Sequence, residues 1–123
     1  MTIQELYARI GGNYEQAQRV MKMDKLIDRY VRKLPNSGAY EALMAAGESM
    51  DGTKLFESAH ALKGVCANLG LDEIAATASE ITEDFRPGAT RKLSDDEIKA
   101  RIAKVDELYQ RALKGIQEYA ASV

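Results

Sequence analysis

His60 is the residue whose chemistry can be followed most directly from the sequence. The chain holds one His and one Cys, Cys66. A single imidazole rules out mechanisms that need two histidines, and His60 with Cys66 cannot assemble a four-ligand zinc site. A neutral imidazole is a good nucleophile near pH 7, since its unperturbed pKa is about 6.5. Any histidine chemistry in this protein is therefore expected at His60, with no metal ligands around it.

The residues one turn after His60 suit the transfer of a charged group. On a helix, Lys63 and Gly64 lie on the same face as His60. The Lys63 ammonium can stabilise the negative oxygens of a phosphoryl group. Gly64 costs about 1 kcal/mol relative to alanine in mid-helix. Together with Ala67 it leaves nearly bare backbone for an approaching molecule. This pattern favours phosphoryl transfer through a bulky partner.

The helix expected over about 52–69 places His60 opposite an apolar stripe. The stripe consists of Leu55, Leu62, Cys66 and Leu69. The residues around His60 on the exposed face are candidates for partner docking, namely Thr53, Phe56, Glu57, Gly64 and Ala67. Phe56 has two interpretations, since either the N-terminal segment covers it or it belongs to a docking patch. The buried Cys66 is expected to be inert packing.

Composition and charge exclude several classes of protein. The 123 residues are 46% hydrophobic and 29% charged, which is typical of one globular domain, here 1–123. A net charge of −2 does not favour binding to nucleic acid or to a membrane. The sequence has no glycine-rich nucleotide loop, no secretory signal and no apolar run of about 18 residues. We expect a monomeric cytoplasmic protein without an ATP site.

Helical periodicity runs through nearly the whole chain and predicts an all-α protein. The periodic segments cover about 3–10, 23–34, 40–47, 52–69, 72–85 and 98–119. Asn36 or Ser37 is expected to cap the third segment, and Asp51 the fourth. Ser94 and Glu97 form an S-x-x-E capping box before the last helix.

Short connections between the three long helices make them antiparallel neighbours. We expect an up-down antiparallel four-helix bundle in which the N-terminal segments supply the fourth helix and a lid. The last helix carries a heptad pattern, which would also fit a coiled-coil dimer. Packing within one bundle, however, buries the apolar stripe of every helix.

The residues His60–Gly64, followed by Asn68–Gly70, resemble the H-x-L-K-G-x-x-x-x-L-G signature of histidine-containing phosphotransfer (HPt) domains. The likeness implies a phosphorelay intermediate of two-component signalling rather than an autonomous enzyme. His60 would accept a phosphoryl group from the aspartyl phosphate of a response-regulator receiver and pass it to another receiver. Lys63 would assist at the phosphate, and Gly64 would leave room for the receiver. The expected partners are receivers and a hybrid sensor histidine kinase, with Mg²⁺ supplied by the receiver and no cofactor held by this chain.

The helix after the His60 helix offers further candidates. A turn near Leu71 folds position 60 back toward position 82, so Thr82 could donate a hydrogen bond and Arg86 could supply charge at the site. Glu57 and Glu83 would repel a phosphoryl group on His60 mildly, which would keep it ready for transfer.

Two other functions stay open at this stage. The chain could be the phosphate-accepting module of a separate chemotaxis-type histidine kinase. It could also be a helical adaptor that uses the surface around His60, Phe56 and Gly64 only for binding.

Overall fold

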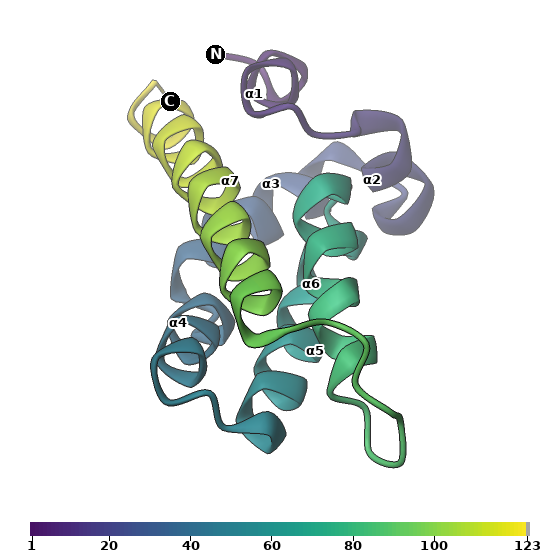
Figure 1. The fold of residues 1–123 in the computed structure, drawn as a ribbon. Coiled ribbons are helices and arrows are strands. Elements are labelled where there is room, and N and C mark those ends of the chain that lie inside the picture. The colour runs from purple at the N-terminus through teal and green to yellow at the C-terminus, as the bar shows by residue number, and fades with distance from the viewer. Residues whose placement is uncertain (123) are drawn as a thin grey trace.

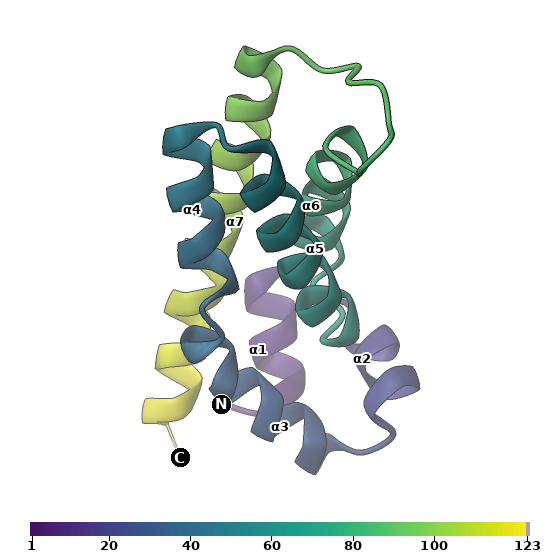
Figure 2. The same ribbon diagram turned by 90° about the horizontal axis from the view of Figure 1, so that it is seen from below.

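A computed structural model describes residues 1–122 of the chain, which form an all-helical fold (Figures 1 and 2). Val123, the last residue of the predicted domain 1–123, lies outside the described residues. The elements are α1 (Ile3–Ile10), α2 (Tyr14–Met21), α3 (Asp24–Lys33), the short 3₁₀ turn η1 (Leu34–Asn36), α4 (Ala39–Ser49), α5 (Gly52–Asn68), α6 (Asp72–Asp84) and α7 (Asp95–Ala121). The expectation of an all-α protein is confirmed.

The helices α4 to α7 pack side by side. Helix α5 lies between α4 and α6, and α7 contacts both α4 and α6 from the other side. Helix α4 therefore completes this group, whereas α1, α2 and α3 gather around one end of it (Figure 2). Within residues 1–122, no helix combines the length and the apolar character needed to cross a membrane.

The apolar stripes expected from the sequence are buried in the core. The three stripe residues of α5 and Leu69, which caps its C-terminal end, are at most 1% exposed. The heptad residues of α7 are buried as well, namely Ile98, Ile102, Val105, Tyr109, Ala112, Ile116 and Tyr119. The capping box at the start of α7 is also confirmed, because the Ser94 hydroxyl accepts from the Glu97 amide and the Glu97 carboxylate accepts from the Ser94 amide. Intramolecular packing thus occupies the face that a coiled-coil dimer would have used.

The fold differs from the sequence prediction in its N-terminal third. Helix α2 was not predicted because Ala17 is its one buried residue, which leaves no apolar stripe to recognise. Two residues of the apolar pattern predicted over 23–34 face solvent, since Met23 is 51% exposed and Tyr30 is 44% exposed.

The start and end of α4 also differ from the prediction. The expected caps, Asn36 and Ser37, do not cap α4, because the chain turns at Gly38 and the helix begins after it without a side-chain cap. Helix α4 continues through Gly47 to Ser49. Gly47 thus lies inside the helix and not at its end. A Cβ at this position would lie 2.8 Å from the Ile102 side chain of α7, so the glycine allows the two helices to pack closely.

The N-terminal segment holds the turn between α5 and α6. The buried Tyr7 hydroxyl donates to the Leu69 carbonyl at 2.6 Å. Gly70 adopts a left-handed conformation with φ of 70°, and its carbonyl accepts from the Asn13 amide at 2.7 Å. A Cβ at Gly70 would lie 2.2 Å from the Asn13 carbonyl oxygen, so only glycine fits at this position.

We predict that Tyr7→Phe lowers the free energy of unfolding by about 1–3 kcal/mol, since the Leu69 carbonyl would lose its donor inside the protein. Urea unfolding followed by far-ultraviolet circular dichroism measures this. Tyr30→Phe is the matched control and should change the stability little, because Tyr30 is 44% exposed whereas Tyr7 is 1% exposed. Equal stabilities of Tyr7→Phe and the unmodified protein would contradict the prediction.

Candidate functional site

His60 lies in the middle of α5 with its side chain exposed. Helix α5 begins after Asp51, whose carboxylate accepts from the Lys54 amide as predicted for the cap. Leu55 and Leu62 of the same helix face the core. Because burial of this stripe fixes the rotation of the helix, His60 points away from the core, as the sequence predicted.

An aromatic ring stacks on His60, and a guanidinium group lies over that ring. The Phe56 ring, one turn earlier on α5, is nearly parallel to the imidazole, with centroids 5.7 Å apart and an angle of 8°. The Arg86 guanidinium, just after α6, lies 5.5 Å from the centroid of the Phe56 ring. The N-terminal helices gather at the other end of α5, so they do not cover Phe56 (Figure 1). Phe56 is half-buried, and its contacts are with His60 and Arg86 instead of the N-terminal segment; its part in docking stays a prediction.

Arg86 is held by Glu83 from the last turn of α6. Its Nε and a terminal nitrogen donate to the two Glu83 carboxylate oxygens at 2.9 and 2.8 Å. These hydrogen bonds lower the pKa of the Glu83 carboxyl, and the nearby Lys63 and His60 lower it further. Glu83 is therefore bound directly to Arg86, with Lys63 and His60 in its wider surroundings.

The surface next to His60 is open at Gly64. A Cβ built on Gly64 would meet no atom within 4 Å. Thr53 and Glu57 are exposed on the same helix, while Lys63 and Ala67 are half-buried. The structure thus places these predicted docking residues on α5 around an unobstructed stretch of backbone.

Thr82 does not lie at this site, so the prediction that its hydroxyl donates a hydrogen bond there is wrong. The side chain is fully buried, and its hydroxyl donates to the Ala78 carbonyl within α6 at 2.9 Å. One residue along a helix corresponds to a rotation of about 100°. Thr82 consequently faces the core, whereas Glu83 and Arg86 reach the surface.

The pairing of Glu83 with Arg86 was not recognised from the sequence. Both residues were candidates, but with separate roles. Their spacing of three residues was the available signal, because side chains at i and i+3 are neighbours on a helix surface.

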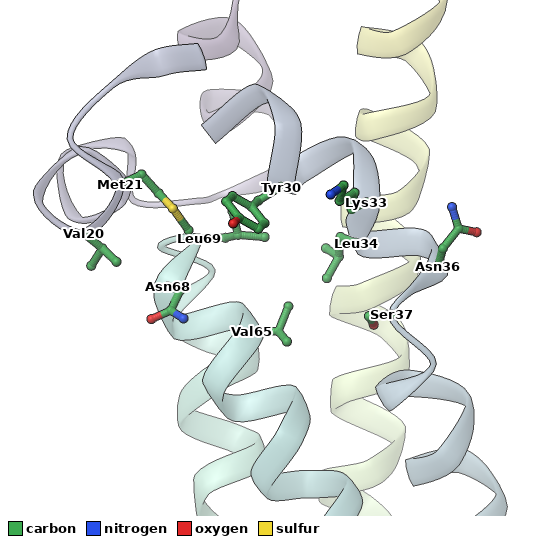
Figure 3. Close-up of a pocket in the computed structure, with 10 residues that line it drawn as sticks. All are labelled: Val20, Met21, Tyr30, Lys33, Leu34, Asn36, Ser37, Val65, Asn68 and Leu69. Atoms are coloured by element: carbon green, nitrogen blue, oxygen red, sulfur yellow. The ribbon is translucent and has the colours of Figure 1, made fainter. Parts of the chain in front are cut away.

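A separate apolar groove of about 660 Å³ lies between α2, α3, η1 and the last turns of α5 (Figure 3). Its lining residues are Val20, Met21, Tyr30, Lys33, Leu34, Asn36, Ser37, Val65, Asn68 and Leu69. Val65 and Tyr30 point into the space between the helices (Figure 3). None of the predicted site residues lines this groove.

Cys66 lies in the core and takes no part in the His60 site. It is fully buried, and burial raises the pKa of its thiol to about 12, so the thiol stays protonated near pH 7. Within residues 1–122, the His, Cys, Asp and Glu side chains do not gather in groups of three that could hold a metal ion.

Comparison with known protein families gave a match over most of the chain. A family model described as "Hpt domain" matches residues 15–115, which include His60, Lys63, Gly64 and Arg86. Helix α1 lies before the matched range. The same sequence matched no curated protein and no solved structure.

Proposed function

This chain belongs to the Hpt domain family, and from that membership we propose that His60 is its phosphoacceptor. Members of the family are phosphotransfer carriers in two-component signalling, and they interact with receiver domains and kinases. The observation that carries the assignment is the position of the chain's one histidine, exposed in mid-helix beside Lys63 and the open surface at Gly64.

The proposed reaction is an exchange between a receiver aspartate and His60. The unprotonated nitrogen of the neutral imidazole attacks the phosphorus atom, and a P–N bond forms. The bond between phosphorus and the aspartate oxygen breaks, and its electron pair returns to the receiver's carboxylate. The other imidazole nitrogen keeps its proton. Donation to a second receiver is the reverse of these steps.

The residues around His60 would stabilise charge, orient the imidazole and contact the receiver. In the proposal, Lys63 and Arg86 stabilise the negative oxygens, and Phe56 fixes the plane of the imidazole. Gly64 and Ala67 admit the receiver, which also touches Thr53 and Glu57. The receiver holds the Mg²⁺ that offsets the charge of its own aspartyl phosphate.

The proposal extends to the protein as a whole. It is a monomer of the cytoplasm, without an ATP site, in which α4 to α7 form an antiparallel four-helix bundle. It takes its phosphoryl group from the receiver of a hybrid sensor kinase and delivers it to another receiver.

A transfer assay tests this function. A receiver labelled by a small ³²P phosphodonor is mixed with the unmodified chain and Mg²⁺, and we expect label on the chain as an acid-labile, base-stable adduct. Labelling by an ATP-charged kinase but by no receiver would support direct phosphorylation by a kinase instead. A chain that takes label from neither would be a binding module, and the proposal would fail.

A further inference from the structure

The ion pair between Glu83 and Arg86, next to the Phe56 ring, is exposed enough to rearrange. The Glu83 side chain is 55% exposed and the Arg86 side chain 44%, although two hydrogen bonds join them. An exposed pair of this kind contributes little to stability, about 0–1 kcal/mol. Its partners can therefore exchange when a stronger acceptor comes within reach.

Arg86 and His60, where such an acceptor would form, both lie against the ring of Phe56. The Arg86 guanidinium lies over the Phe56 ring, and that ring stacks on the imidazole of His60. A phosphoryl group on His60 would carry a charge of about −1.5 to −2 and three acceptor oxygens. A guanidinium binds phosphate through two parallel hydrogen bonds, as it does the carboxylate of Glu83.

We propose that Glu83 holds Arg86 while His60 is unmodified, and that Arg86 moves to the phosphoryl oxygens when His60 is phosphorylated. The inference rests on the proposed function, since it needs His60 to be the phosphoacceptor. Glu83 is then a positioning residue that acts through Arg86.

This exchange controls how readily the phosphoryl group leaves. Arg86 stabilises the phosphorylated state only after it gives up two hydrogen bonds to Glu83, so part of the stabilisation is offset. The phosphohistidine is left less stable than it would be beside an unpaired arginine. Glu83 thereby keeps the phosphoryl group transferable to the next receiver.

Removal of the Glu83 charge tests the proposal. For Glu83→Gln we expect the phosphorylated state of His60 to be favoured. The equilibrium constant for transfer of the phosphoryl group from a receiver to His60 should rise about three-fold. The half-life of the isolated phosphohistidine should lengthen by a similar factor. Glu80→Gln is the matched control, because Glu80 lies one turn earlier on α6, is equally exposed at 55% and pairs with Arg101 instead. An unchanged constant and half-life in Glu83→Gln would overturn the proposal.

A double variant separates this exchange from simple repulsion between Glu83 and the phosphoryl group. In an Arg86→Gln background, Glu83→Gln should have no further effect, because Glu83 would have nothing left to hold. If the same three-fold change persists without Arg86, Glu83 acts by direct repulsion and the proposal is wrong.

A spectroscopic experiment keeps this inference distinct from the proposed function. Phosphoramidate can charge an exposed histidine without any partner protein, because its P–N bond breaks, ammonia leaves and a new P–N bond forms to the imidazole. The ¹⁵N signal of Arg86 Nε should shift when His60 is charged, and an unmoved signal would overturn the exchange. If that signal shifts but no receiver exchanges phosphoryl with His60, the inference stands and the proposed function fails. If His60 takes no phosphoryl group even from phosphoramidate, both fail.

Discussion

His60→Gln is expected to abolish phosphoryl uptake and to leave the fold intact. The imidazole is exposed, so its loss removes no core contact, and its stacking on Phe56 lies at the surface. Glutamine has similar length but no nucleophilic ring nitrogen. Since the sequence has no other histidine, no second imidazole can take over. The assay is label transfer from a charged receiver, with circular dichroism and urea unfolding as the checks on folding.

The strength of this test comes from the single histidine. Uptake of base-stable label by the His60→Gln variant would remove His60 as the acceptor, and the phosphotransfer assignment at this site with it. Loss of uptake together with loss of helical signal would show that the side chain matters to the fold, against its observed exposure.

Gly64→Gln is expected to slow transfer from a receiver at least about ten-fold, since small displacements of reacting groups are costly. Its side chain would lie one turn from His60, on the surface where the receiver must approach. The free energy of unfolding should rise by about 0.5–1 kcal/mol, because a Cβ at Gly64 meets open space and glutamine favours a helix more than glycine does.

Rapid-quench measurement of the transfer rate, together with urea unfolding, tests both parts of this second prediction. Ala103→Gln is the control, an exposed position on α7, which packs against α4 and α6. It should leave the rate unchanged. A Gly64→Gln variant that transfers at the normal rate would show that the bare helix surface is not needed for receiver approach.

Sequence patterns predicted the fold where helices bury a clear stripe. The capping box at Ser94 and the heptad residues of α7 fixed the last helix, and Asp51 fixed the start of α5. Helix α2 was not predicted, because Ala17 is its one buried residue and no apolar stripe marks it in the sequence. The hydrogen bond from the Asn13 amide to the Gly70 carbonyl holds its start against the turn after α5. Such contacts are set by tertiary packing, which no local pattern records.

At the candidate site too, features set by a single helix could be predicted and features set by the packing of two helices could not. The exposure of His60 and the open face at Gly64 could be predicted, since both follow from rotation of one helix about its axis. The layer of Phe56 and Arg86 could not, because it depends on the register between α5 and α6. An error of one residue in that register explains why Thr82 was expected at the surface and lies in the core.

The contacts of α1 show that a family boundary and a folding unit need not coincide. The family model begins at residue 15, yet the Tyr7 hydroxyl donates to the carbonyl of Leu69, the residue that caps the C-terminal end of the His60 helix. Gly115 of α7 is packed so closely against Ile10 that a Cβ there would lie 2.3 Å from its side chain. A domain excised at the family boundary, or grafted into another protein there, would leave an apolar seam on α7 uncovered. Residues 1–14 should therefore be included when this domain is excised or grafted into another protein.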